Sequence, residues 1–237
     1  MRTVNLPNAI TALRILAAPV VALLTLWPSW PARALAFLLF LAAAITDYYD
    51  GKLARSRGLV TDLGRLLDPL ADKLLLAATF IPMFILQAPP HDVLGGFTAA
   101  GGAWGLEALP FRTPIGVVPF PFWVVALVLG RELFMTLFRQ AALWRGVVIA
   151  AIGPAKWKTG FQWTWVGSAL FWFSAALILE HAKWPASVTV PVADFIGTVG
   201  TVAMCGAVVL TVYSLALYIH RYGMIFVRPR AGARQTP

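Results

Sequence analysis

Six long apolar segments, separated by shorter polar or basic stretches, constrain this 237-residue chain more than any other feature. They lie at residues 10–27, 33–50, 66–86, 119–143, 160–179 and 195–219. Each is close to the ~20 residues that an α-helix needs to cross about 30 Å of hydrocarbon. The runs are continuous rather than alternating, which argues against a membrane β-barrel. The sequence therefore predicts an all-α integral membrane protein with six transmembrane helices, forming a single domain over residues 1–237.

The composition excludes the common soluble classes. Charged residues make up 12% of the chain and apolar residues 59%, against roughly 25% and roughly 45–50% in soluble proteins. A net charge of +9 on a polar chain would suggest a nucleic-acid partner. Here the bases lie between apolar runs, so we expect contact with membrane lipid and no nucleic acid. The single cysteine, Cys205, excludes an internal disulfide and a Cys-based zinc site, and we expect it to be buried.

Basic residues mark alternate loops and set the expected orientation. They gather in the second loop, in the fourth loop and in the C-terminal tail, whereas the other loops carry one base each. Basic loops stay in the cytoplasm, so both termini are expected there. Residues 88–118, rich in Gly and Pro, are then an extracytoplasmic loop with room for a short interfacial helix. Residues 228–237 are expected to form a flexible tail.

Half of the ten acidic residues lie between Asp47 and Asp72. Asp47 and Asp50 are spaced i, i+3 at the end of the second segment, and Asp68 and Asp72 are spaced i, i+4 at the start of the third. Antiparallel helices joined by a short loop lie side by side. The four carboxylates can therefore converge at the cytoplasmic boundary of the membrane.

Four carboxylates in a medium of low dielectric repel one another, and divalent cations would relieve that repulsion. Oxygen ligands favour Mg²⁺ or Mn²⁺ over zinc. Two such ions about 4 Å apart can hold a pyrophosphate and stabilise both the attacking and the leaving oxygen. Gly51, Ala54 and Gly64 lack bulk on the same helix faces, where a nucleotide would approach the backbone.

Other interpretations of the acidic residues exist. A single Asp near a helix end is often a cap or a surface charge, and two could pair with Arg55 or Arg65. Four at helical spacing are poorly explained in that way. A cation transporter would instead spread its acidic groups across the depth of the membrane, whereas these cluster at one level.

The acidic region resembles the signature of the CDP-alcohol phosphatidyltransferase family, with the pattern Asp-x2-Asp-Gly-x2-Ala-Arg-x8-Gly-x3-Asp-x3-Asp. The resemblance implies a six-helix membrane enzyme, commonly a homodimer. Such an enzyme transfers a phosphatidyl or substituted phosphoryl group from a CDP-linked donor to an alcohol and releases CMP. The expected location is the inner (plasma) membrane of a bacterium, with the active site facing the cytoplasm.

Other segments are similar to family members that use CDP-diacylglycerol as the donor and sn-glycerol 3-phosphate as the acceptor. These segments are 5–14, 61–73, 130–132 with Arg139, 145–146 and 156–162. Two features depart from the pattern: Ala155 stands where glycine is expected, and the 88–118 loop is long. Inositol phosphate, or phosphatidylglycerol as in cardiolipin synthase, stays open as an alternative acceptor.

The resemblance also implies roles for single residues. Asp47, Asp50 and Asp68 would ligate two divalent ions, and Asp72 would ligate or lie beside one and act as the general base. The CDP-diacylglycerol headgroup would contact a set of five residues in the same region, namely Gly51, Ala54, Arg55, Thr61 and Gly64. Arg55 could instead mark the cytoplasmic face, and Thr61 could be a helix cap.

An acceptor such as glycerol 3-phosphate is a dianion and needs fixed cations. Arg131 and Arg139 are spaced i, i+8 on the fourth segment, and Lys156 and Lys158 precede the fifth. Together they could form a basic, acceptor-binding pocket opposite the acids. Arginine suits such a pocket because its guanidinium fork binds phosphate in a bidentate manner. Glu132 could orient one of the arginines by pairing with it. The alternative is that these bases only anchor the helices at the cytoplasmic face.

Overall fold

The computed structural model describes residues 6–56, 62–87, 111–118, 120–149 and 153–224. Each of the six apolar segments corresponds to one helix. The helices are α1 (Leu6–Leu26), α2 (Trp30–Ser56), α3 (Asp62–Gln87), α4 (Phe122–Trp144), α5 (Gly153–His181) and α6 (Ala186–Tyr222). Two short strands, β1 (Phe111–Thr113) and β2 (Gly116–Val118), precede α4. The predicted flexible tail at 228–237 lies outside the described residues.

Four of these helices are long and apolar enough to cross a membrane, which is consistent with an integral membrane protein. The stretches that qualify are Asn8–Leu26, Trp30–Asp47, Trp157–His181 and Ala186–Tyr222. Helices α3 and α4 carry charged side chains within their length, among them Asp72 and Glu132. The predicted helical fold is therefore confirmed, while the count of six membrane crossings stays a prediction.

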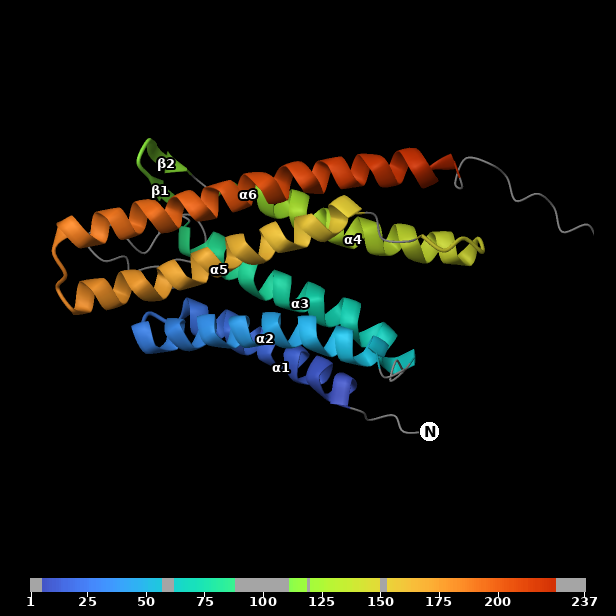
Figure 1. The fold of residues 1–237 in the computed structure, drawn as a ribbon, viewed down its shortest axis with the longest axis horizontal. Helices are drawn as coiled ribbons and strands as arrows, with labels where there is room; N and C mark the ends of the chain where they lie inside the picture. The colour runs from blue at the N-terminus through green and yellow to red at the C-terminus, as the bar shows by residue number, and fades with distance from the viewer. Residues whose placement is uncertain (1–5, 57–61, 88–110, 119, 150–152, 225–237) are drawn as a thin grey trace, which may run out of the picture.

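The helices form an elongated bundle in which α1 packs against α2 and α3, α2 against α5, and α5 against α6 (Figure 1). Helix α4 contacts both α3 and α6. The N-terminus of α1, the end of α2, the start of α3, the end of α4 and the end of α6 all lie toward the right of Figure 1. The segments that carry most of the bases thus share one end of the bundle.

Aromatic packing around Trp165 joins α5 to α3 and to the residues just before α4. The Trp165 ring is fully buried. Its centroid lies 4.6 Å from that of Phe80 on α3 and 5.0 Å from that of Phe120, just before α4. Large apolar rings account for most of the free energy gained by burial in such a core. This aromatic contact therefore joins α3 and the chain just before α4 to α5.

The described part of the 88–118 loop, residues 111–118, forms a β-hairpin. The short interfacial helix for which the sequence leaves room stays a prediction, because the rest of the loop lies outside the described residues. The antiparallel register of the hairpin pairs Phe111 with Val118. The hairpin lies on α6 (Figure 1), where a Cβ on Gly197 would come within 1.8 Å of the Arg112 carbonyl oxygen. A Cβ on Gly200 would similarly lie 2.4 Å from the Phe111 ring. These two glycines therefore serve packing within the chain.

Cys205 is on α6 as expected, but the prediction that it is buried is wrong. Its side chain is exposed on the outside of the bundle. The reason is that the whole circumference of α6 is apolar, so the sequence does not reveal which face of the helix packs against the protein. Cys205 therefore lies on the side of α6 that a surrounding membrane would cover.

Candidate active site

The side chains of two of the four predicted acidic residues are described, and the fold brings these two together. Asp47 lies on α2 and Asp72 on α3, and both carboxylates face Arg14 of α1. The Arg14 Nη1 atom is 2.5 Å from Asp47 Oδ1 and 3.4 Å from Asp72 Oδ1. The expected convergence of carboxylates from two helices is thus confirmed for this pair.

Arg14 is a residue of this site to which no role was assigned from the sequence. Its side chain is only 1% exposed, whereas those of Asp47 and Asp72 are 37% and 54% exposed. A guanidinium removed from water is costly unless acidic partners compensate for its charge. The available signal was a lone basic residue within the first apolar run. The sequence could not show that its partners lie on α2 and α3.

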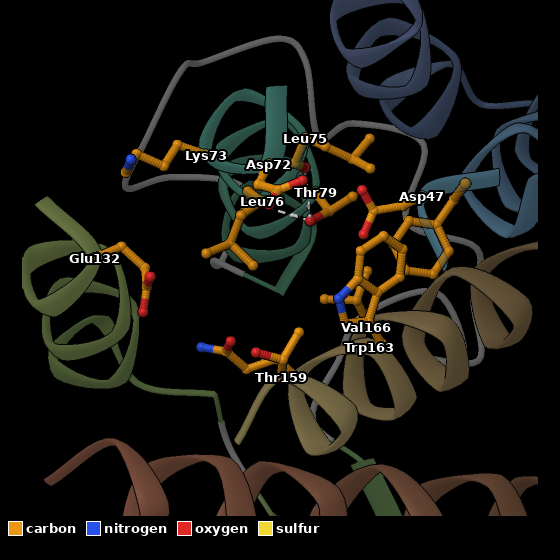
Figure 2. Close-up of a pocket in the computed structure, with 12 residues that line it drawn as sticks. Asp47, Asp72, Lys73, Leu75, Leu76, Thr79, Glu132, Thr159, Trp163 and Val166 are labelled. Atoms are coloured by element: carbon orange, nitrogen blue, oxygen red, sulfur yellow. Dashed lines mark hydrogen bonds between the residues drawn. The ribbon is translucent and has the colours of Figure 1, made fainter. Parts of the chain in front are cut away.

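A cavity of about 120 Å³ opens beside the two carboxylates. Asp47, Asp72 and Lys73 line one side, and Glu132 of α4 approaches from another (Figure 2). Its remaining walls come from α2, α3 and α5, namely Phe40, Leu75, Leu76, Thr79, Thr159, Gln162, Trp163 and Val166. The cavity lining therefore combines acidic and basic side chains with apolar and uncharged polar ones.

The α5 wall follows helical spacing. Thr159, Gln162, Trp163 and Val166 are spaced i, i+3, i+4 and i+7, so they share one face of the helix. The Trp163 ring stacks on Phe40 of α2 with centroids 5.2 Å apart. That contact fixes the rotation of α5 and presents the Gln162 side chain to the cavity. Lys73 and Gln162 belong to this site although the sequence analysis assigned them no role.

Among the predicted acceptor-binding residues, Arg131 and Lys158 share one acidic partner, whereas Arg139 contacts a tyrosine. Glu132 accepts hydrogen bonds from Lys158 and from Arg131, the latter at 2.9 Å, so the expected pairing of Glu132 with an arginine is confirmed. Arg131 also donates to Ser214 Oγ at 3.1 Å. Arg139 instead donates to the Tyr218 hydroxyl at 3.1 Å.

The described cations of this set do not line the cavity. In the part of the chain that the structure describes, Glu132 reaches the cavity wall while Arg131, Arg139 and Lys158 do not. Arg131 and Lys158 are 7% and 2% exposed. Glu132 therefore connects the cavity to a buried basic cluster, which we define as Arg131, Glu132 and Lys158. Binding of an acceptor to these cations stays a prediction.

Several predicted site residues have side chains outside the described part of the chain. Helix α2 extends through Asp50, Gly51, Ala54 and Arg55, and α3 through Gly64 and Asp68, so both halves of the motif are helical. Lys156 lies in the first turn of α5. Thr61 falls between α2 and α3, in residues that the structure does not describe. The proposed contacts of these residues are not tested.

The donor atoms suit a divalent cation. Asp47 and Asp72 come from different helices and already share one positive group, the Arg14 guanidinium. Carboxylate oxygens are the ligands that Mg²⁺ and Mn²⁺ prefer. Among the described side chains, no group of three or more His, Cys, Asp or Glu residues is gathered. The pair thus fits part of a site to which Asp50 and Asp68 would contribute.

The chain is similar to one protein family and to a named relative over most of its length. The profile of the family "CDP-alcohol phosphatidyltransferase" matches residues 4–227. A Mycobacterium tuberculosis protein named "Probable phosphatidylglycerophosphate synthase" is 30% identical over 238 residues, covering 99% of this chain and 88% of the relative.

Two further relatives match shorter parts of the chain. A Rickettsia bellii protein named "CDP-diacylglycerol--glycerol-3-phosphate 3-phosphatidyltransferase" is 51% identical over 78 residues, or 32% of this chain and 42% of the relative. An Arabidopsis thaliana protein, "CDP-diacylglycerol--glycerol-3-phosphate 3-phosphatidyltransferase 1, chloroplastic/mitochondrial", is 32% identical over 168 residues, or 69% of this chain and 49% of the relative.

Proposed function

Because the chain belongs to the CDP-alcohol phosphatidyltransferase family, we propose that it transfers the phosphatidyl group of CDP-diacylglycerol to sn-glycerol 3-phosphate. The products are phosphatidylglycerol phosphate and CMP, and the reaction belongs to phospholipid biosynthesis. The relatives named above support this choice of donor and acceptor. The observation that carries it is the convergence of Asp47 and Asp72 on one cavity between helices of the bundle.

The acidic residues would hold the donor. Asp47, Asp50, Asp68 and Asp72 are the ligands for two divalent ions, Mg²⁺ or Mn²⁺. When bound, such ions neutralise a pyrophosphate and stabilise negative charge that develops during displacement at phosphorus. The headgroup of CDP-diacylglycerol would lie against Gly51, Ala54, Arg55, Thr61 and Gly64. The small residues in this set let phosphate approach the helix backbone.

Asp72 is the proposed general base. Its carboxylate lies at the cavity wall and is the more exposed of the described acidic pair. It accepts the proton of an acceptor hydroxyl, whose oxygen then attacks the β-phosphorus of CDP-diacylglycerol. The bond from that phosphorus to the CMP oxygen breaks, and CMP leaves. A positioned base of this kind contributes about 10²–10⁴-fold to a rate.

The acceptor phosphate would bind on the side of Glu132. Arg131, Arg139, Lys156 and Lys158 supply positive charge there, and the buried pairing of Glu132 with Arg131 and Lys158 holds two of these cations in place. A guanidinium prepositioned in this way loses little entropy on binding phosphate. An inositol phosphate would also require basic residues, so charge alone does not select the acceptor.

The same proposal includes membrane topology and assembly. All six helices cross the inner membrane of a bacterium, both termini are cytoplasmic, and the active site faces the cytoplasm. The grouping of the basic segments at one end of the bundle supports this orientation (Figure 1). A homodimer is expected from the family resemblance and would be checked by the mass of the detergent-solubilised protein.

The deciding experiment is an assay of purified protein with CDP-diacylglycerol and a panel of alcohols. The panel contains glycerol 3-phosphate, inositol phosphate and phosphatidylglycerol, and CMP release is followed with and without EDTA. We expect release with glycerol 3-phosphate and Mg²⁺ or Mn²⁺. Release only with another alcohol would overturn the acceptor assignment, and no release with any alcohol would overturn the proposed activity.

A further inference from the structure

The side chain of Gln162 is buried within the candidate site, yet its amide nitrogen lacks a hydrogen-bond partner in the described part of the chain. Gln162 is 4% exposed. Its Nε2 atom has no hydrogen-bond partner among the residues that the structure describes. Buried amide groups are nearly always hydrogen-bonded, because an unpaired one loses its contacts with water and gains none in return. An exception of this kind requires an explanation.

The location of Gln162 supplies an explanation for its unpaired amide nitrogen. The residue lies on the face of α5 that lines the cavity, between Thr159 and Val166, and the walls from α3 and α4 carry Asp72 and Glu132. The Trp163–Phe40 stack prevents α5 from turning this face away. Any molecule that fills the cavity would therefore meet the carboxamide of Gln162.

We propose that Gln162 is a substrate-binding residue, whose Nε2 donates a hydrogen bond to a phosphate oxygen of the molecule in the cavity. The inference rests on the proposed function for the identity of that molecule. Both substrates carry phosphate, so the oxygen belongs either to the donor CDP-diacylglycerol or to the acceptor glycerol 3-phosphate. Lys73 lines the same cavity and contributes a positive charge to it, beside the carboxylates of Asp47, Asp72 and Glu132.

The test compares three substitutions on α5. Gln162→Met keeps the length of the side chain and removes the amide, and Gln162→Glu removes the Nε2 donor and adds a negative charge. The matched control is Thr164→Val, because the Thr164 hydroxyl bonds to the Gly160 carbonyl of its own helix at 3.0 Å and lies outside the cavity lining. Thermal unfolding confirms that each variant is folded before KM and kcat are measured.

We expect Gln162→Met to raise KM for one substrate about tenfold to a hundredfold, as for loss of a hydrogen bond to a charged group. Gln162→Glu should raise it further, and Thr164→Val should leave it unchanged. The substrate whose KM rises identifies the phosphate that Gln162 contacts. Unchanged KM for both substrates in Gln162→Met, with or without a fall in kcat, would overturn the inference.

A binding measurement separates this inference from the proposed activity. Thermal stabilisation by CDP, by glycerol 3-phosphate and by inorganic phosphate is recorded for the wild type and for Gln162→Met. At least one of the three should stabilise the wild type and should lose most of that effect in the variant. This result would support the role of Gln162 even if no alcohol gave turnover. Equal stabilisation of both proteins would overturn it.

Discussion

Arg14 of α1 and Asp47 of α2 form an ion pair in which the Nη1 and Oδ1 atoms are 2.5 Å apart, with the guanidinium almost fully buried. The same Nη1 atom lies 3.4 Å from Asp72 of α3. One cation from the first helix therefore holds together the two acidic residues on the next two helices. A divalent ion bound by these carboxylates would compete with Arg14 for the same oxygens.

The first prediction concerns this competition. Arg14→Gln removes the cation that offsets the repulsion between Asp47 and Asp72, so the variant should be destabilised most when divalent ions are absent. Breaking a fully buried pair costs about 3–5 kcal/mol, and we expect about 2–3 kcal/mol here because the carboxylates are partly exposed. Thermal unfolding in EDTA and in saturating Mg²⁺ measures the difference.

The control for Arg14 is Arg112→Gln, which breaks the more exposed pair of Arg112 with Asp194 at 2.8 Å. Exposed pairs contribute about 0–1 kcal/mol, so this variant should unfold at nearly the wild-type temperature in both conditions. An equal loss of stability with and without Mg²⁺ in Arg14→Gln would mean that Arg14 only joins the helices.

The second prediction concerns the proposed metal ligands. Asp47→Asn, Asp50→Asn and Asp68→Asn each keep the shape of the side chain and remove an anionic ligand. Each variant should lose at least several kcal/mol of transition-state stabilisation, seen as a loss of CMP release. EDTA should abolish wild-type activity, and Mg²⁺ or Mn²⁺ should restore it. Full turnover in EDTA would refute the site.

The third prediction concerns Asp72 as the general base. Asp72→Asn should lower kcat by roughly 10²–10⁴-fold, which is the usual contribution of a positioned base. The KM for CDP-diacylglycerol should change less than kcat if Asp72 acts mainly on the proton. Steady-state kinetics with both substrates varied provides both values. A variant with wild-type kcat would exclude Asp72 from the chemical step.

The fourth prediction concerns the acceptor. Arg139→Gln removes one positive charge and should raise KM for glycerol 3-phosphate about tenfold to a hundredfold, with little change for CDP-diacylglycerol. Tyr218→Phe is the control, because it removes the hydroxyl that Arg139 contacts and keeps the charge. If only the KM of the donor rises, Arg139 belongs to the lipid site instead.

Lys158→Gln tests the buried basic cluster, and its effect is measured both on the unfolding temperature and on KM. Lys158 is 2% exposed and contacts Glu132, so its replacement should lower the unfolding temperature as well as raise the KM of the acceptor. In Lys158→Gln, Glu132 keeps Arg131 as a partner, so adding Glu132→Gln should lower the stability further, because the buried Arg131 then loses its acidic partner. If neither KM nor stability changes, the cluster has no role in binding or folding.

The fifth prediction concerns topology. Single cysteines at Ser56, Ala99 and Ala231, in a chain with Cys205→Ala, would be labelled in sealed vesicles by a reagent that does not cross membranes. Positions 56 and 231 should react from the cytoplasmic side and position 99 from the other side. Labelling of positions 56 and 99 from the same side would contradict six crossings.

Much of the architecture follows from the sequence because it depends on local patterns. Apolar segments of about 20 residues specify helices in a membrane, and the structure has a helix at each of the six. The spacing of Asp47, Asp50, Asp68 and Asp72 placed them correctly on two successive helices. The hairpin at Phe111–Val118 was not foreseen, since its docking depends on the space above Gly197 and Gly200 of α6.

The sequence by itself determined the helices, the acidic motif on α2 and α3, and the family to which the motif belongs. Only the tertiary structure decided which side chains meet across helices. Arg14 reaches Asp72 across 58 positions of the chain, and Gln162 enters the same cavity from α5. Helical periodicity arises from contacts between near neighbours in sequence. The face that each helix turns inward depends on how all the helices pack together.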